Sequence, residues 1–316
     1  MIAVCITTYN HESYIAQCLD SVLAQVCDEP IRIYIGDDCS TDNTATICRH
    51  YAATDKRIEY VRRDTNCGLT NNTIDLYRLI MADGCDYIAM LDGDDWWTET
   101  HKLQLQTDYL RTHPETGFVH TNGRTMTGSH KWTFGQLEGV YGVDSPGFAN
   151  CTVMFRTSLL NDQLLADIEA QHFLWLDYPL YGVFYQQTKW VYLPQQTAVW
   201  RDHISVSQPE TAQSSLRLRE ERCRMWKWLD SRFPGKTGWT EQAEKEYLLS
   251  ERLTIIYIFN DRNLVTTEML NDWKPAKWKQ RIKQKALKNS VFYTILQKIS
   301  LLFAYLRKKL YLCSRF

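Results

Sequence analysis

Hydrophobic and polar positions alternate along the first 122 residues in two rhythms, which predict strands and helices in turn. Short apolar runs rich in β-branched residues predict strands at 2–8, 31–35, 58–61, 87–91 and 117–121. Apolar residues at helical spacing predict helices between them at 14–26, 40–50, 71–82 and 101–110. Helices that separate strands indicate right-handed crossovers, and therefore an α/β fold with a parallel sheet covered on both faces.

The pattern becomes less regular beyond residue 122. Glycine and aromatic residues dominate 134–148, which is typical of a loop-rich segment. Short apolar runs predict two further strands, at 151–155 and 191–193, and helical periodicity predicts helices at 211–233, 241–260 and 277–312. We therefore expect an α/β domain over 1–210, a helical extension over 211–273 and a separate tail over 274–316.

Polar residues follow three of the predicted strands, at the point where each strand ends. They lie at 7–10, 37–38 and 92–95. Ligands of parallel sheets bind beyond the carboxyl ends of the strands. Three such clusters predict a polar, acidic site at one edge of the sheet.

The acidic cluster at 92–95 has the form of a metal site. Asp92 and Asp94 flank Gly93, which permits a tight turn that points both carboxylates the same way. Close like charges are unstable unless a cation neutralises them, and Mg²⁺ or Mn²⁺ prefers such oxygen ligands together with substrate phosphates. The alternative interpretation is a solvated turn rich in aspartate.

A second acidic cluster begins at Asp37 and Asp38. Ser40 or Thr41 fits the role of a helix cap, but that role does not require the two aspartates before it. A carboxylate at a strand end can accept the imide N–H of uracil or thymine. Tyr9 can supply a face for the base to stack on.

Four motifs in order carry a resemblance to a known family. They are ITTYN at 6–10, GDDCSTD at 36–42, NCG at 66–68 and LDGDD at 91–95. This series resembles glycosyltransferase family 2, whose members are inverting enzymes with the GT-A fold that use nucleotide-sugar donors. The resemblance is strong over 1–120, thinner over 120–210 and absent from the C-terminal third. It implies a nucleotide-binding half over 1–122 and an acceptor and sugar half over 123–210.

The resemblance implies nucleotide contacts along the strand ends. Thr7 and Tyr9 would line the nucleobase pocket, and Asp38 would bind the N3–H of the base. Asn71 or Asn72, which follow the turn at 66–68, would lie near the base or the ribose.

The resemblance also implies the phosphate and metal contacts. Asp92 would contact the ribose, and Asp94 would bind the Mn²⁺ or Mg²⁺ ion that bridges the diphosphate. The chain departs from the family pattern at two places: Thr8 replaces a proline often found before the Tyr-Asn pair, and no proline follows the acidic motif within 96–101. Neither departure touches the implied chemistry.

Inverting transfer requires a base that takes the proton of the acceptor hydroxyl. Asp177 resembles the family's acidic residue that opens a helix after an apolar run. The alternative is that Asp177 only caps this helix beside Pro179. Asp167 and Glu169 lie in a more polar stretch and are weaker rivals for the role of base.

The segment at 200–207 resembles the family's late signature, an aromatic residue followed by Arg-x-His. His203 would complete the metal shell or touch the diphosphate, and Arg201 would pair with phosphate oxygens. Residues 148–156, which contain Asn150, Cys151 and Thr152, are expected to line the donor-sugar or acceptor side.

Charge is divided unevenly between the two ends of the chain. The net charge is −1, but 274–316 holds 12 basic and no acidic residues, which leaves 24 basic and 37 acidic residues in 1–273. Apolar residues recur at helical spacing from 292 to 310, and basic residues interrupt them, so a clean transmembrane span is not expected. The pattern favours a basic amphipathic helix on an anionic membrane surface. A helix packed on the domain is the alternative, and no nucleic-acid-binding motif is present.

The ten cysteines include no CxxC pair, and the chain opens directly on a strand without a signal peptide. These features predict a reduced, cytoplasmic setting, peripheral to the inner face of the cytoplasmic membrane. The expected function is metal-dependent inverting transfer of a sugar from a nucleotide-sugar, with a UDP-sugar favoured. The expected acceptor is a glycan or a polyprenyl-linked molecule in surface polysaccharide synthesis.

Two other functions compete with this expectation. A nucleotidylyltransferase-like sugar-phosphate enzyme needs a glycine-rich basic loop after its first strand, and 7–12 contains no glycine, lysine or arginine. A non-catalytic nucleotide- or glycan-binding protein is the second alternative. A degraded acidic pair or a missing base would favour it, and neither is seen.

Overall fold

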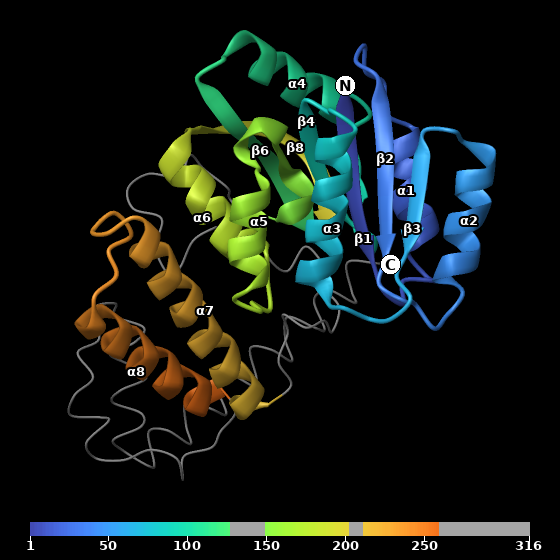
Figure 1. Ribbon diagram of the computed structural model, residues 1–316. Coiled ribbons are helices and arrows are strands. Elements are labelled where there is room, and N and C mark those ends of the chain that lie inside the picture. The colour runs from blue at the N-terminus through green and yellow to red at the C-terminus, as the bar shows by residue number, and fades with distance from the viewer. Residues whose placement is uncertain (127–148, 202–210, 259–316) are drawn as a thin grey trace, which may run out of the picture. The chain divides into compact units, whose positions relative to one another are not determined.

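The structure is a computed structural model that describes residues 1–126, 149–201 and 211–258. The chain divides into two compact units, one made of 1–203 with 225–238 and the other of 204–224 with 239–316. The first unit contains an eight-stranded sheet (Figure 1). Its strands are β1 (Ile2–Thr8), β2 (Ile31–Asp37), β3 (Ile58–Arg62), β4 (Tyr87–Asp92), β5 (Trp96–Trp97), β6 (Thr116–Thr125), β7 (Val153–Arg156) and β8 (Lys189–Trp200).

Helices connect most of these strands. They are α1 (Ile15–Leu23), α2 (Thr44–Thr54), α3 (Leu69–Ala82), α4 (Lys102–Thr112), α5 (Asp162–Glu169) and α6 (Asp177–Gln187), with short 3₁₀ turns η1 (Asn150–Thr152) and η2 (Thr157–Leu159) beside β7. The strands and helices predicted over 2–121 are confirmed, with shifts of a few residues at their ends. The α/β class with helices on both faces is confirmed as well.

The strand order is β3-β2-β1-β4-β7-β6-β8-β5. Four of the seven neighbouring pairs are parallel, and β7 runs antiparallel to both β4 and β6. The expected GT-A-like, mostly parallel sheet is therefore confirmed, with β5 and β7 as antiparallel strands. An antiparallel neighbour needs no crossover helix, and the sequence predicts no helix between the strands at 117–121 and 151–155.

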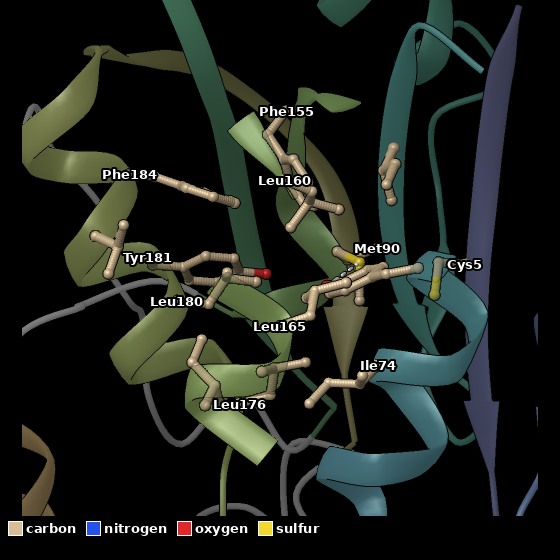
Figure 2. Packing of buried hydrophobic residues seen from close by; sticks show 14 of the residues in the cluster. Cys5, Ile74, Met90, Phe155, Leu160, Leu165, Leu176, Leu180, Tyr181 and Phe184 are labelled. Carbon is tan, nitrogen blue, oxygen red and sulfur yellow. Dashed lines mark hydrogen bonds between the residues drawn. The ribbon is translucent and has the colours of Figure 1, made fainter. Parts of the chain in front are cut away.

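The sheet is buried on both faces because side chains of successive strand residues point to opposite sides. One face packs against α3, α5 and α6 and contains Ala3 and Cys5 of β1. The other packs against α1, α2 and α4 and contains Val4 and Ile6 of the same strand. Figure 2 shows the first cluster, where Tyr181 of α6 and other side chains gather beside the sheet.

The C-terminal helices that the structure describes are α7 (Ala212–Arg232) and α8 (Glu241–Ile258). They confirm the helices predicted at 211–233 and 241–260. Within the second unit, Arg219 donates to Glu251 across 2.7 Å. The helix predicted at 277–312 and the basic tail lie outside the described residues. None of the helices in the described part of the chain combines the length and apolar character needed to cross a membrane.

Candidate functional site

The register of the sheet brings the ends of β1, β2 and β4 together. Thr8 pairs with Asp37 and Thr7 pairs with Asp92. The Thr7 hydroxyl donates to Asp92 Oδ1 across 3.1 Å, and the Asp38 backbone N–H donates to the Thr8 carbonyl oxygen across 3.0 Å. Three of the residues predicted to contact the nucleotide, Thr7, Asp38 and Asp92, therefore meet at one edge of the sheet.

The acidic turn after β4 is tightly packed against the loop after β1. A Cβ atom on Gly93 would lie 2.8 Å from Thr8 Oγ1 and 3.0 Å from His11 Nδ1, so only glycine fits there without a shift. The Asp94 carboxylate lies 3.9 Å from His11 Nε2, and its side chain is 15% exposed. The turn thus presents the partly accessible Asp94 carboxylate beside His11, for which the sequence motifs predict no role.

Asp92 accepts hydrogen bonds from more than one element. The Asn150 side-chain amide lies 3.4 Å from each of its carboxylate oxygens, and Asn150 in turn accepts the Tyr181 hydroxyl across 2.6 Å. Burial, with repulsion from Asp94, raises the pKa of Asp92 to about 7, although the bonds from Thr7 and Asn150 oppose the rise. A nearby cation would favour the charged form of such a carboxylate.

Asp177 is the first residue of α6, as expected for an acidic residue that opens a helix. Its Oδ1 accepts the backbone N–H of Tyr178 across 2.8 Å. Its charge is close enough to contribute to the raised pKa of Asp92. Asp177 therefore lies on the acidic side of the site, and its role as base stays a prediction.

The two other candidates for the base, Glu169 and Asp167, form ion pairs with arginines. Glu169 forms an ion pair with Arg78 across 2.7 Å. Asp167 is paired with Arg232, and the hydrogen bond from that guanidinium lowers the pKa of Asp167. Both carboxylates thus have evident structural partners.

Asp38 directly follows β2 and is 4% exposed. Its side chain lies against the turn that precedes α3. Its two carboxylate oxygens accept the backbone N–H groups of Cys67 and Gly68, across 2.7 and 2.9 Å. Gly68 has a φ of 85°, a conformation that favours glycine. Oδ1 also accepts the Cys67 thiol across 3.2 Å. Oδ2 has a second lone pair, so the predicted contact with a base N–H is chemically compatible with this arrangement.

The two asparagines after this turn differ in their surroundings. Asn72 is 1% exposed, donates to the Gly36 carbonyl oxygen across 2.8 Å and accepts Arg63 Nε across 3.0 Å. Its side chain therefore braces the end of β2. Asn71 is less buried and donates to the Cys67 carbonyl oxygen across 3.0 Å. Of the two, Asn71 has the more accessible side chain for a nucleotide.

Tyr9 is 42% exposed, which leaves its ring accessible for stacking. Asp37, which precedes Asp38 in the second acidic cluster, is fully buried. Asp37 accepts the Ser40 backbone N–H across 2.8 Å and the Tyr60 hydroxyl across 2.6 Å. The first aspartate of the pair therefore holds the loop, and the second lies at the turn where the nucleotide contact is predicted.

Arg201 follows β8 and contacts the acidic turn through its backbone and its side chain. Its backbone N–H donates to Asp95 Oδ1 across 2.8 Å, and its Nε donates to the Asp94 carbonyl oxygen across 2.7 Å. The sequence motif predicts a phosphate contact for Arg201, and the bonds to the acidic turn have no counterpart in that prediction. His203, the predicted metal ligand, lies outside the described residues.

The donor set of the turn can be compared with what a divalent cation needs. Among the described residues, no group of three or more His, Cys, Asp or Glu side chains is arranged to hold a metal ion. Mg²⁺ and Mn²⁺ sites of the nucleotide-dependent kind need only one or two carboxylates, because substrate phosphates supply the other oxygens. The carboxylates of Asp92 and Asp94, at the two ends of one tight turn, fit such a shared site.

The model of the family described as Glycosyl transferase family 2 matches residues 3–167, slightly more than half of the chain. An uncharacterized protein of Mycobacterium tuberculosis is 42% identical over 110 residues, which are 34% of this chain and 31% of that protein. Glycosyltransferase GlyA of Streptococcus pneumoniae is 34% identical over 113 residues, 35% of this chain and 14% of GlyA. Chondroitin synthase of Escherichia coli is 29% identical over 127 residues, 40% of this chain and 18% of the synthase. These matches cover about a third or less of the relatives' length.

Solved structures share the fold. The TarS protein of S. aureus in complex with UDP superposes with a TM-score of 0.54 at 18% identity, over 90% of this chain and 79% of TarS. The mannosyltransferase PcManGT of Pyrobaculum calidifontis, in complex with GDP-Man and Mn²⁺, gives 0.56 at 14% identity, over 93% and 86%. The sheet, its covering helices and the family match agree with the GT-A fold expected from the sequence. The chain therefore belongs to glycosyltransferase family 2.

Proposed function

We propose that this chain is an inverting, metal-dependent glycosyltransferase that moves a sugar from a nucleotide-sugar donor to a glycan or lipid-linked acceptor. The observation that carries the proposal is the convergence of Thr7, Asp38, Asp92 and Asp94 at one sheet edge. Two of these are joined by a hydrogen bond, Thr7 and Asp92. This edge is where nucleotides bind in open α/β sheets.

The nucleotide half of the site is assigned by the chemistry of its side chains. Asp38 offers an acceptor for an imide N–H, Tyr9 offers a stacking face, and Asn71 lies on the same side as the Cys67 turn. Uracil and thymine present the required N3–H, and UDP is the nucleotide bound to TarS. These features support a UDP-sugar as the donor.

The metal half of the site centres on Asp94 and Asp92, with His203 as the predicted further ligand. A bound Mg²⁺ or Mn²⁺ ion would supply positive charge that stabilises the leaving diphosphate. Mn²⁺ accompanies the nucleotide-sugar in PcManGT, which supports the same requirement here. Arg201, expected from the sequence to contact phosphate, hydrogen-bonds to Asp94 and Asp95 of the acidic turn.

The chemical step needs a carboxylate for the acceptor proton. In the proposed reaction the acceptor oxygen bonds to the anomeric carbon as the bond to the diphosphate oxygen breaks, and the proton passes to Asp177. Asp177 lies at the start of α6, close enough for its charge to act on Asp92. Asn150 and Tyr181 connect Asp92 with the same helix, which holds the two carboxylates in a defined relation.

The acceptor is proposed from the tail and from the relatives. Residues 274–316 carry 12 basic residues with helically spaced apolar positions, which suits docking on an anionic membrane surface. We place the protein at the cytoplasmic face of the membrane, where polyprenyl-linked glycans are extended. The similarity to chondroitin synthase supports polysaccharide synthesis as the setting.

A panel of nucleotides tests the proposal. Thermal unfolding of the full chain is followed with UDP, GDP, dTDP and CMP, each with and without Mn²⁺. A ligand that binds the folded state raises the unfolding temperature. A shift confined to UDP with Mn²⁺ supports the assignment, and a shift with another nucleotide changes the donor but keeps the reaction class. Nucleotide binding without any release of UDP from UDP-sugars would favour a non-catalytic binding protein.

A further inference from the structure

We propose that Arg201 is a positioning residue that fixes the shape of the acidic turn, and that this is its main contribution to the site. The inference rests on the proposed function, because it takes Asp94 as the residue that binds the metal ion. It concerns how the chain itself holds Asp94 in place.

Arg201 forms hydrogen bonds with two consecutive residues of the turn, Asp94 and Asp95. Its side-chain Nε donates to the Asp94 carbonyl oxygen across 2.7 Å, and its backbone N–H donates to Asp95 Oδ1 across 2.8 Å. Asp95 is almost fully buried. These bonds fix the backbone of the turn, and with it the position from which the Asp94 side chain projects.

The guanidinium group itself contacts two aromatic rings. Its central carbon lies 4.4 Å from the centroid of the Tyr14 ring and 4.7 Å from that of Trp96. Its terminal nitrogens donate to Gln17 Oε1 across 2.8 Å and contact Met126 Sδ at 3.2 Å. Two cation–π contacts and a directed fork of donors hold the arginine in place, so its Nε is presented to the turn in one orientation.

These contacts come from segments far apart in the sequence. Tyr14 and Gln17 lie at the start of α1, Trp96 is in β5, Met126 follows β6 and Arg201 follows β8. The arginine therefore ties the loops around the site to the acidic turn. Lysine has one point charge in place of the planar fork and cannot reproduce this set of contacts.

The experiment compares the full-length wild-type protein with Arg201→Lys and Arg201→Met. Mn²⁺ binding is measured by the loss of the free-ion signal in electron paramagnetic resonance at saturating UDP. UDP and UMP affinities are measured separately without metal. Loss of a charge-assisted hydrogen bond at the turn is expected to raise the Mn²⁺ concentration for half-saturation about tenfold in both variants. Metal-free affinities for UDP and UMP should stay near those of the wild type.

A direct phosphate contact predicts a different result. Metal-free UDP affinity would then fall while UMP affinity changed less, and the Arg201→Lys variant would retain part of the UDP affinity. That outcome, or an unchanged Mn²⁺ requirement in both variants, would overturn the proposal. If Arg201→Met fails to fold, Tyr14→Leu removes one of the two aromatic rings that contact the guanidinium and leaves the arginine itself unchanged. A raised Mn²⁺ requirement in that variant supports the positioning role, and an unchanged one contradicts it.

Wild-type protein and Asp94→Ala separate this test from the test of the proposed function. If wild-type protein with UDP binds no Mn²⁺, the proposed function fails, whatever the Arg201 variants do. If wild-type protein binds Mn²⁺ and Asp94→Ala does not, the metal assignment holds and the Arg201 variants alone decide the positioning role.

Discussion

Asn150 donates its side-chain amide to Asp92, with 3.4 Å to each carboxylate oxygen. The same asparagine accepts the hydroxyl of Tyr181 across 2.6 Å. The helix that begins with Asp177 is thereby connected to the end of β4. Hydrogen bonds through Asn150 and Tyr181 thus join the proposed nucleotide contact, Asp92, to the helix that carries the proposed base.

The variant Asn150→Ala should weaken UDP binding about three- to tenfold. Asp92 loses a hydrogen-bond donor that offsets its repulsion from Asp94. Isothermal titration calorimetry with Mn²⁺ measures the change. Tyr181→Phe is the matched control, since it removes only the hydroxyl and leaves the amide on Asp92, and its effect should be smaller. Wild-type affinity in Asn150→Ala would show that this contact has no part in donor binding.

The variant Asp177→Asn should bind UDP-sugar normally and lose turnover. The amide has nearly the shape of the carboxylate but cannot accept the acceptor proton, so only the chemical step is affected. Release of UDP is followed in the presence of candidate acceptors, and donor binding is measured by thermal shift. Asp167→Asn serves as the control and should retain turnover. Normal turnover by Asp177→Asn would remove Asp177 from the role of base.

The variant Gly93→Ala should destabilise the fold by about 1–3 kcal/mol, because the new methyl group overpacks the loop at Thr8 and His11. The turn must move to relieve the contact, so Mn²⁺-dependent UDP binding should fall as well. Urea unfolding gives the free energy of unfolding, and calorimetry gives the affinity. A variant with unchanged stability and unchanged binding would contradict the packing seen at this turn.

Lys102 is fully buried, donates to Gln106 Oε1 across 2.6 Å and lies 4.4 Å from the centre of the Trp97 ring. Burial lowers the pKa of Lys102 to about 7, below the value of about 10.4 expected in the unfolded chain. Between these two pH values the unfolded state binds a proton that the folded state lacks. The stability contributed by this group therefore rises with pH across the window and is lowest near and below pH 7.

The variant Lys102→Met should lack this rise. Its free energy of unfolding, relative to the wild type, should be most favourable near pH 7 and should fall by several kcal/mol toward pH 10, at about 1.36 kcal/mol per pKa unit as an upper bound. Urea unfolding at a series of pH values measures the difference. The exposed Lys56→Met serves as the control and should show a flat difference. A flat profile for Lys102→Met would mean that Lys102 has an ordinary pKa in the folded protein.

The fold was largely predictable from the sequence because apolar periodicity is a local signal. The strand ends with Thr7, Asp38 and Asp92 were predicted to meet, and the sheet register places them together. The two-residue strand β5 was missed because it is too short to show a period. The antiparallel direction of β7 was missed because direction depends on pairing between distant segments.

The details of the site were less predictable because they depend on long-range contacts. Arg201 contacts Asp94 across 107 positions of the sequence, and Asn150 reaches Asp92 across 58. Neither separation leaves a pattern along the chain. Asn71 and Asn72 look alike in sequence, and only burial distinguishes the brace of β2 from the more accessible residue.

Binding of UDP should depend on a metal ion held by Asp94. Calorimetry of the full-length protein with UDP, with and without Mn²⁺, is compared between the wild type and Asp94→Ala. Mn²⁺ should strengthen UDP binding at least about tenfold in the wild type and have no effect in Asp94→Ala. Equal affinity with and without Mn²⁺ in the wild type, or an undiminished Mn²⁺ effect in Asp94→Ala, would contradict it.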